Sequence, residues 1–443
     1  MIKKRLGFIS LGCAKNLVDS EEIIGNLVNQ GYRLIPELDK ADVVIINTCA
    51  FLQIAREEAI STIKEIAEMK KERNSKITKL CVVGCLAQYF SEKQLKKIVP
   101  EVDMVIPINH YQQLPALLNN NLLEAEPSDT KPTGQTKKRF LTTSPHSVYV
   151  KIAEGCDNRC SYCLIPSLRG KLQSKTIDDI VYEVRALQKM GAKEINLIAQ
   201  DTTAYGKDLY GKYMLTKLLE RVAKVRGIQW IRLLYAHPAR LSNDLLKVMA
   251  NEPKICNYLD LPIQHISNKI LASMNRKVTK EKIISAYCRL KEYLPEVVLR
   301  TTVMVGYPGE GEDEFAELVN FLQQYPFERL GGFIFSSEKG TPAFHLPGRV
   351  NKDIALNRLN KIMKMQQSIS REYNRNLLGK TVDVLIDQYQ EKRGKAIARM
   401  YSQAPEVDGK IILTKSWGIK VGDIVKAKVT GIGTYDLMGE KLR

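Results

Sequence analysis

Three cysteines, Cys156, Cys160 and Cys163, stand in the stretch Ala-Glu-Gly-Cys-Asp-Asn-Arg-Cys-Ser-Tyr-Cys. Thiolates are the soft ligands that iron–sulfur clusters need. A 4Fe-4S cluster that only transfers electrons is normally closed by four thiolates, whereas this C-x3-C-x2-C spacing provides three. The spacing therefore predicts a cluster in which one iron is open to bind a small molecule directly.

Zinc is the main alternative for these three thiols. A structural zinc site uses four ligands and normally joins one C-x2-4-C pair to a second pair downstream. The sequence has no such second pair after Cys163. The cluster interpretation is favoured, and zinc or a chance grouping of cysteines remains open as the alternative.

A second set of three cysteines follows the predicted strands of the N-terminal region. Cys13, Cys49 and Cys85 come after apolar runs at residues 6–10, 43–46 and 80–83. Ligands of open α/β sheets bind outside the carboxyl ends of the strands, so these thiols can converge on a second metal site. The alternative for each is a small buried core residue, which is the role expected for the other three cysteines considered, Cys81, Cys256 and Cys288.

Length and charge limit the possible classes of protein. The 443 residues are enough for two to four domains with ordinary globular cores. Sixty-seven Lys and Arg against 49 Asp and Glu give a formal charge of +18, which favours an anionic partner such as nucleic acid or an acidic protein surface. Lysines scattered over solvated faces are the alternative, because no block of five like charges appears.

The cellular compartment is expected to be the cytoplasm. The apolar start at residues 6–11 is short and lacks a cleavage site for a signal peptide, and no uninterrupted apolar run approaches 18 residues. Nine cysteines in a chain of this length suit metal ligation in a reducing compartment better than a disulfide framework.

The predicted organisation is an α/β multidomain chain. Residues 1–117 read as an open parallel α/β sheet, in which Asp19 and Glu22 indicate a helix N-terminus. Residues 118–147 are polar and predict a linker. Residues 148–378 alternate strands with amphipathic helices, which predicts a partial TIM-type (βα) barrel with a long trailing helix from about 352 to 378. Residues 379–443 contain short β-branched runs between Gly and Pro, typical of a small antiparallel β-barrel.

The strands and helices expected from the hydrophobic pattern indicate where the cysteine loop lies in the barrel. Strands are predicted at residues 148–152, 194–198, 231–235, 258–261, 297–305 and 331–335, and helices at 178–190, 215–225, 280–293 and 312–324. The loop with Cys156 follows the first of these strands. That is the end of the strands where barrel active sites are built.

The cysteine spacing, with the aromatic Tyr162 just before the last cysteine, resembles that of the radical S-adenosylmethionine (SAM) enzymes. In that superfamily the open iron chelates SAM, which an electron from the cluster cleaves to methionine and a 5′-deoxyadenosyl radical. The cofactor carries this chemistry, and the protein supplies ligation, orientation and exclusion of water. The resemblance implies that Cys156, Cys160 and Cys163 ligate the SAM-cleaving cluster.

The whole chain resembles the radical SAM methylthiotransferases, whose C-terminal barrel is a TRAM domain. The stretches at residues 10–21 (Ser-Leu-Gly-Cys-Ala-Lys-Asn-Leu-Val-Asp-Ser-Glu) and 404–409 (Ala-Pro-Glu-Val-Asp-Gly) are similar to the RimO branch. That branch modifies an aspartate of protein twelve of the small ribosomal subunit. The alternative is the MiaB branch, which modifies an adenosine beside the tRNA anticodon and usually has Gly-Cys-Gln-Met-Asn in the first stretch.

The resemblance also implies the roles of the second trio and the reaction. Cys13, Cys49 and Cys85 would hold an auxiliary 4Fe-4S cluster with an open iron for the sulfur to be delivered. SAM would serve both as methyl donor and as radical source, and the product would be 3-methylthioaspartate, formed at the aspartate β-carbon. A low-potential electron donor of the flavodoxin or ferredoxin type and RNA contact through the TRAM-like domain are the partners expected besides the ribosomal protein or subunit.

Residues that contact SAM are expected at other strand ends. Tyr162 could stack on the adenine, and Gln200 and Asp201 follow the strand at 194–198. Gly306 and Glu310 belong to a Gly-Tyr-Pro-Gly-Glu turn, for which an ordinary strand-to-helix connection is the alternative. His237 and His265 also end strands, and a structural role is favoured for both.

Two alternative functions involve no radical chemistry. An iron–sulfur electron carrier or RNA-binding protein without catalysis predicts no SAM cleavage, which fits poorly with an open iron. Ordinary SAM-dependent methyl transfer would require a Gly-rich nucleotide loop after the first strand, which this sequence lacks. It would also leave both cysteine trios unexplained.

Overall fold

The computed structural model describes residues 4–118 and 139–442, and these cluster into two compact units. The first unit contains the N-terminal region up to Thr143 and two short parts of the cysteine loop, Glu154–Asp157 and Cys163–Lys171. The second unit contains the remaining residues from Ser144 onward. The linker predicted at residues 118–147 falls mostly on 119–138, outside the described residues, and the predicted domain boundaries stay predictions.

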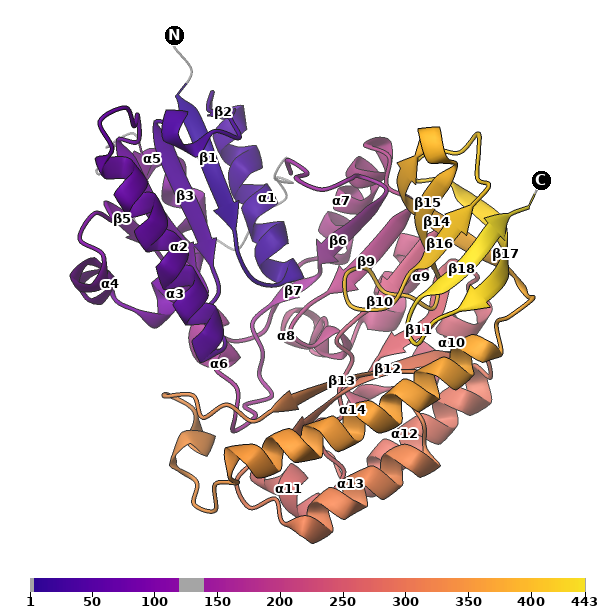
Figure 1. Ribbon diagram of the computed structural model, residues 1–443. Helices are drawn as coiled ribbons and strands as arrows, with labels where there is room; N and C mark the ends of the chain where they lie inside the picture. Colours follow the sequence, from indigo (N-terminus) through magenta and orange to yellow (C-terminus); the bar gives the residue numbers. More distant parts are fainter. Residues whose placement is uncertain (1–3, 119–138, 443) are drawn as a thin grey trace. The chain divides into compact units, whose positions relative to one another are not determined.

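The first unit is built on a five-stranded parallel sheet with strand order β2-β1-β3-β4-β5 (Figure 1). The apolar runs predicted β1, β3 and β4, whereas β2 and β5 are too short to give a pattern. Strand β3 is buried at every position, as expected where helices cover both faces of a parallel sheet. The elements are β1 (Arg5–Ser10), α1 (Ala14–Asn29), β2 (Arg33–Leu34), η1 (Leu38–Lys40), β3 (Val43–Thr48), α2 (Gln53–Lys71), β4 (Lys79–Gly84), α3 (Cys85–Tyr89), α4 (Glu92–Ile98), β5 (Met104–Ile106), η2 (Ile108–Gln113), α5 (Leu114–Leu118) and, from the cysteine loop, α6 (Ile165–Arg169).

Alternation along the strands assigns the helices to the two faces of this sheet. Ile45 of β3 packs in one core with Leu27 of α1, and α5 belongs to the same face. The next residue, Ile46, packs in the other core with Ile63 of α2, together with α3, α4 and Leu168 of α6. The carboxyl ends of β1, β3 and β4 therefore form one edge that both cores support.

The second unit contains a six-stranded parallel sheet with order β13-β12-β11-β10-β9-β6. This confirms the partial βα barrel, and the helix predicted at 312–324 has the predicted bounds. The elements are β6 (Ser147–Lys151), β7 (Ala153–Glu154), β8 (Gln173–Ser174), α7 (Ile177–Lys189), β9 (Glu194–Ile198), η4 (Thr202–Ala204), α8 (Lys207–Tyr210), α9 (Leu215–Ala223), β10 (Trp230–Leu233), η5 (Pro238–Arg240), α10 (Asn243–Asn251), β11 (Ile255–Asp260), α11 (Asn268–Ser273), α12 (Lys280–Tyr293), β12 (Val298–Val305), α13 (Glu312–Gln324), β13 (Arg329–Ile334), η6 (Pro342–His345) and α14 (Lys352–Arg375).

A closed five-stranded barrel completes the second unit, in the order β14-β15-β16-β18-β17. All neighbours are antiparallel except β16 and β18, which are parallel. The sequence pattern missed β18, because its apolar residues Leu437 and Met438 are followed directly by glycine and charged residues. The elements are β14 (Thr381–Gln390), η7 (Glu391–Arg393), β15 (Lys395–Met400), β16 (Ile411–Thr414), β17 (Ile424–Ile432) and β18 (Leu437–Lys441).

A buried ionic network fastens this barrel to the amino end of the six-stranded sheet. Glu194 at the start of β9 accepts hydrogen bonds from Arg232 Nη2 and Arg399 Nη2, both at 2.8 Å, and its side chain is fully buried. Arg399 also donates to Asp387 of β14, which pairs with His146 at 2.9 Å. Burial alone would raise the pKa of Glu194, but the two guanidinium groups outweigh it and lower the pKa to about 2.

Candidate active site

The three N-terminal cysteines lie at one edge of the first sheet, as the sequence predicts. Cys13 is the N-cap residue of α1, Cys49 directly follows β3, and Cys85 begins α3 after β4. Gly12 has a φ of +97°, and a Cβ there would lie 2.8 Å from the Cβ of Cys49. Only glycine fits this close approach, which brings the Cys13 and Cys49 segments together.

Two buried asparagines, which the sequence reasoning missed, lock the strand ends that carry these thiols. Asn16 Nδ2 donates to the carbonyl oxygens of Leu11 and Thr48, both at 2.9 Å. Asn47 Nδ2 donates to Asn16 O and to Ser20 Oγ, also at 2.9 Å. Both asparagines stand beside a cysteine in the motifs Cys-Ala-Lys-Asn and Asn-Thr-Cys, and this neighbourhood is the signal that could have found them.

The prediction that Asp19 caps a helix is wrong. Helix α1 begins at Ala14, so Asp19 and Glu22 lie in its interior. The Asp19 side chain is 2% exposed and accepts a hydrogen bond from Arg169 Nη1 at 2.9 Å. A capping pattern could not reveal this pairing, because Arg169 comes from α6, 150 residues further along the chain.

Charges and burial act differently on the three thiols. Burial would raise the pKa of Cys13, but Lys15, the Asn16 backbone N–H and Arg169 together hold it below its usual value. Burial raises the pKa of Cys49, and it raises the pKa of Cys85 to about 11 against the opposing charge of Arg169. Because iron binds thiolates, nearby positive charge favours loading of this edge with metal.

The donor set of this edge fits a cluster better than a single ion. Within residues 4–118 and 139–442, no three His, Cys, Asp or Glu side chains meet closely enough to hold one metal ion. A four-iron cube binds each thiolate through a different iron, so its ligands stand further apart than those of a single ion. Three soft thiol donors at adjacent strand ends therefore fit a 4Fe-4S cluster, although the ligation itself stays a prediction.

Cys160 of the second trio is buried in the second unit. Arg276 Nη1 lies 3.8 Å from Cys160 Sγ. The next residue, Ser161, donates from its backbone N–H to Met274 O at 2.9 Å, and its hydroxyl lies 2.8 Å from the hydroxyl of Tyr307. The middle of the cysteine loop is therefore fixed by the segment after α11 and by the turn after β12.

Cys156 and Cys163 belong to the first unit. The backbone N–H of Cys156 donates to Gly170 O at 3.1 Å, which closes the base of the loop. The backbone N–H of Ile165 lies 3.5 Å from Cys163 Sγ, at the start of α6. Both thiols are half-buried.

Of the predicted SAM contacts, Asp201 is already occupied by protein groups. Its carboxylate accepts hydrogen bonds from Asn158 Nδ2 at 2.7 Å, Thr203 Oγ1 at 2.6 Å and the guanidinium of Arg240. Since Asn158 lies between Cys156 and Cys160, this network positions the cysteine loop. Tyr162 is half-buried against Tyr307 and Ile270, and Gln200 is half-buried two residues beyond β9.

The turn that contains Gly306 and Glu310 has a clear packing role. A Cβ at Gly306, where φ is +74°, would lie 2.7 Å from the Cβ of Ala355, so glycine permits the close approach of α14. Glu310 Oε1 accepts a hydrogen bond from Arg358 Nη1 at 2.8 Å. Burial raises the pKa of Glu310, although Arg358 opposes the shift.

His237 and His265 have structural contacts through Nδ1, as favoured from the sequence. His237 Nδ1 accepts from the Ala239 N–H at 3.2 Å, and His265 Nδ1 accepts from the Ser267 N–H at 3.0 Å. Burial lowers the pKa of His237 to about 3 and that of His265 to about 4. Both rings are therefore neutral near pH 7.

The remaining cysteines divide into two kinds. Cys81 and Cys256 are buried in β4 and β11, as expected for core residues. The expectation that Cys288 is also a core residue is wrong, because this side chain is exposed. Helix α12 buries Ile283, Ala286 and Leu290, and Cys288 lies on a different face.

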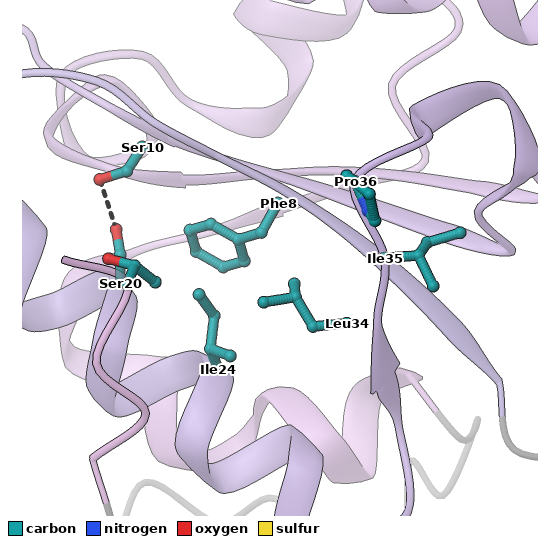
Figure 2. A pocket seen from close by; sticks show the side chains of 8 residues that line it. Phe8, Ser10, Ser20, Ile24, Leu34, Ile35 and Pro36 are labelled. Carbon is teal, nitrogen blue, oxygen red and sulfur yellow. Dashed lines mark hydrogen bonds between the residues drawn. The ribbon is translucent and has the colours of Figure 1, made fainter. Parts of the chain in front are cut away.

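A cavity of about 340 Å³ opens in the first unit between α1 and the β1–β2 edge of the sheet (Figure 2). Its lining is mainly apolar, and its polar end is a 2.7 Å hydrogen bond between Ser10 Oγ and Ser20 Oγ. No cysteine lines it, so the cluster site is distinct from this cavity. The lining residues are Phe8, Ser10, Ser20, Ile24, Leu34, Ile35, Pro36 and Thr142.

Three family models match successive parts of the chain. Residues 5–107 match Uncharacterized protein family UPF0004, residues 150–322 match the Radical SAM superfamily, and residues 378–441 match the TRAM domain. Among solved structures, the radical S-adenosylmethionine methyltransferase TsrM from Kitasatospora setae aligns with a TM-score of 0.55 at 13% identity, covering 77% of this chain and 74% of that chain. This likeness shows a shared fold. Within the described ranges, no helix is long and apolar enough to span a bilayer.

These domains define the chain as a radical SAM enzyme with a TRAM domain. Curated proteins named "Ribosomal protein uS12 methylthiotransferase RimO" are 41% identical in Clostridioides difficile (strain 630), with 99% of each chain covered, and 44% identical in Caldicellulosiruptor saccharolyticus, with 98% of this chain and 99% of the relative covered. The chain belongs to this RimO family of methylthiotransferases. It is thus a radical SAM transferase that uses SAM, and two 4Fe-4S clusters fit this family. The tRNA alternative is not favoured, since these relatives are named for a ribosomal protein.

Proposed function

We propose that this chain methylthiolates the β-carbon of an aspartate in ribosomal protein uS12 to give 3-methylthioaspartate. Support comes from relatives that carry the uS12 name over essentially the whole chain. When bound, the cofactors supply two things. One is a radical that takes a hydrogen atom from the aspartate, and the other is the sulfur that replaces this hydrogen. The protein has to ligate the clusters, orient the substrates and keep water out.

We assign Cys156, Cys160 and Cys163 to the SAM-cleaving cluster and Cys13, Cys49 and Cys85 to the auxiliary cluster. The observation that carries this assignment is the placement of three thiols, each after a separate strand, at one sheet edge, supported by the Asn16 and Asn47 network. A core role explains one such cysteine easily. It does not explain three at equivalent positions beside buried positive charge.

The proposed SAM contacts fall into two roles. Tyr162 and Gln200 are half-buried beyond their strands and are assigned to binding of SAM, and Gly306 and Glu310 to the wall of the same pocket. Asp201 is assigned an indirect role, since its oxygens hold Asn158 and Arg240. It orients the cysteine loop on which SAM binding depends.

We propose that the C-terminal barrel contacts RNA of the ribosomal subunit. Trp417 is 60% exposed, and Lys441 Nζ donates to its carbonyl oxygen at 3.1 Å. An exposed aromatic residue with a lysine bonded to its backbone suits stacking on a base and attraction to phosphate. The net charge of residues 380–443, 12 basic against 8 acidic, agrees with this role.

The remaining partners and boundaries are proposals of the same kind. A low-potential flavodoxin or ferredoxin would deliver the electron, and the enzyme would work in the cytoplasm, where ribosomal subunits are assembled. Domain boundaries are proposed at 117/118, 147/148 and 378/379.

Anaerobic reconstitution tests the assignment. The wild type should bind about eight iron atoms per chain, and a Cys13→Ala, Cys49→Ala, Cys85→Ala variant about four. This variant should still cleave SAM but should no longer thiomethylate uS12, as followed by mass spectrometry of the ribosomal protein. Cys288→Ala, which replaces an exposed cysteine, is the matched control and should behave as wild type. Eight irons in the triple variant would refute the auxiliary site, and modified tRNA nucleosides in place of modified uS12 would refute the substrate.

A further inference from the structure

Arg169 is a buried guanidinium that lies beside the N-terminal thiols in the first unit. Its side chain is 2% exposed. Nη1 donates to Asp19 Oδ2 at 2.9 Å and to both oxygens of Glu154 at 3.0 Å, and Nη2 donates to Asn16 Oδ1. That same Asn16 oxygen lies 3.9 Å from Cys85 Sγ. One side chain therefore contacts two carboxylates and the amide that supports the thiol edge.

Stability alone does not account for the burial of this guanidinium group. Removing an arginine and a carboxylate from water costs several kcal/mol per ion, and a well-packed apolar pair is often as stable or more so. Arg169, Asp19 and Glu154 together carry a net charge of −1, with side chains 2%, 2% and 21% exposed. Charges held in so little water act strongly on any group beside them.

The position of Arg169 in the chain adds a second observation. It lies six residues after Cys163, and its partner Glu154 lies two residues before Cys156. Asp19 and Asn16 lie in α1, the helix that starts directly after Cys13. The ends of the radical SAM cysteine loop are therefore joined, through this one guanidinium, to the helix of the auxiliary thiols.

We propose that Arg169 is a positioning residue that sets the reduction potential of the auxiliary cluster and anchors the ends of the second cysteine loop beside it. The proposal rests on the ligand assignment above, since it takes Cys13, Cys49 and Cys85 as the ligands. The potential of an iron–sulfur cluster depends on nearby charge, hydrogen bonds and exposure to solvent. A buried positive charge stabilises the reduced, more negative form of the cluster and raises the potential.

The test is a redox titration, followed by electron paramagnetic resonance, of the full chain carrying Cys156→Ala, Cys160→Ala and Cys163→Ala, so that one cluster remains. In this background Arg169→Gln should shift the midpoint potential to a more negative value. Glu154→Gln removes a negative charge from the same group and should shift it to a more positive value. Opposite signs are the decisive feature, because structural damage alone has no reason to follow the sign of the charge removed.

Arg139→Gln is the matched control. Arg139 forms a similarly buried pair with Glu21 on the same helix α1, with side chains 5% and 1% exposed. It should leave the potential unchanged. Arg169→Lys, which keeps the charge but not the forked donors, should give a smaller negative shift than Arg169→Gln.

Each outcome decides a specific point. Four irons per chain with an unchanged potential in Arg169→Gln and Glu154→Gln, or shifts of the same sign in both, would overturn the role of Arg169 and leave the ligand assignment intact. A background protein that binds no iron would overturn the ligand assignment, and this proposal with it. If Arg169→Gln loads no iron, the sign of the shift in Glu154→Gln alone decides, and a shift that is not positive counts against the proposal.

Discussion

The two cysteine trios are positioned in opposite ways. Cys13, Cys49 and Cys85 each lie 36 residues from the next, and only the register of three strands brings them to one edge. Ser10 pairs with Asn47, and Thr48 with Gly84. A slip of one residue in either pairing would move a thiol to the wrong face.

The second trio is local in sequence. Cys156, Cys160 and Cys163 lie within eight residues of one loop, so their short spacing in the sequence already keeps them close together. The structure adds the supports, which are the Cys156 to Gly170 hydrogen bond at the base and the Ser161 contacts in the middle. A local trio therefore depends on its anchors, whereas a dispersed trio depends on an entire sheet.

This contrast predicts where substitutions should have their effects. Removing a local anchor should change the behaviour of one loop by a modest amount. Removing a group that holds several strand ends together should abolish the dispersed site while the local one persists. The following predictions test this contrast, beginning with the removal of a ligand.

The largest effect is expected from Cys160→Ala. Loss of one of three thiolates from the local trio should lower iron from about eight to about four per chain and reduce SAM cleavage to the background rate. The auxiliary cluster should persist, because its ligands lie on other elements. Iron analysis and quantification of 5′-deoxyadenosine check this, with Cys288→Ala as control. Loss of all iron would show that the two sites are not independent.

Asn16→Ala should be the strongest disruption of the dispersed trio that leaves every thiol in place. It removes the donors to Leu11 O and Thr48 O and the acceptor for Arg169. Each buried polar group left without a hydrogen bond costs about 1–3 kcal/mol. The free energy of unfolding should therefore fall by about 3–5 kcal/mol. Iron should fall to about four with SAM cleavage retained.

Asn29→Ala is the control for this substitution. It lies at the exposed end of the same helix, α1, and should change neither iron content nor unfolding in urea. An Asn16→Ala protein that keeps about eight irons would show that the thiol edge holds its shape without this amide.

Much of the fold could be predicted because it follows from local patterns. The apolar run of β3, the amphipathic pattern of the helices and the β-branched runs of the barrel each predict the element in which they lie. The short strands β2 and β5 could not be found, because two or three residues carry no periodicity and exist only by pairing with a longer neighbour. The parallel pairing of β16 and β18 is likewise a property of barrel closure.

The positions of the candidate ligands could be predicted because residue type marks them in the sequence, whereas their buried partners were missed because burial does not show there. The six cysteines stand out by type and position. Asn16, Arg169 and Arg276 look like ordinary surface residues in the sequence, because nothing local shows that each is buried beside a thiol. Asp19 was misplaced for the same reason, since a cap and a buried ion pair use the same residue type.

Acid should weaken the ionic network that holds the C-terminal barrel. Glu194 has its pKa lowered to about 2, against about 4.5 when unfolded, so its stabilisation is present above pH 4.5 and is lost as the pH falls toward 2. At about 1.4 kcal/mol per pKa unit this amounts to about 3 kcal/mol. The free energy of unfolding of the metal-free chain, measured in urea, should fall by about 2 kcal/mol of this between pH 7 and pH 3.

Glu194→Gln should abolish this part of the pH dependence. Its stability at pH 7 should be lower than that of the wild type, because Arg232 and Arg399 remain buried without their shared carboxylate. If the wild type and the variant lose stability in parallel below pH 4.5, the carboxylate network does not govern the acid response.

The smallest effect is expected from Tyr307→Phe, which removes one anchor of the local trio. The Tyr307 hydroxyl lies 2.8 Å from Ser161 Oγ and donates to Ser273 O at 3.0 Å. Ser161 keeps its own bond to Ser273 O at 2.9 Å, so the loop should loosen rather than collapse. We expect a loss of about 1 kcal/mol, about eight irons, and SAM cleavage lowered about fivefold. Tyr182→Phe, on the exposed face of α7, should change none of these values. A Tyr307→Phe protein without its second cluster would mean that this hydroxyl is as essential to the local trio as Asn16 is to the dispersed one, and the contrast between the two sites would fail.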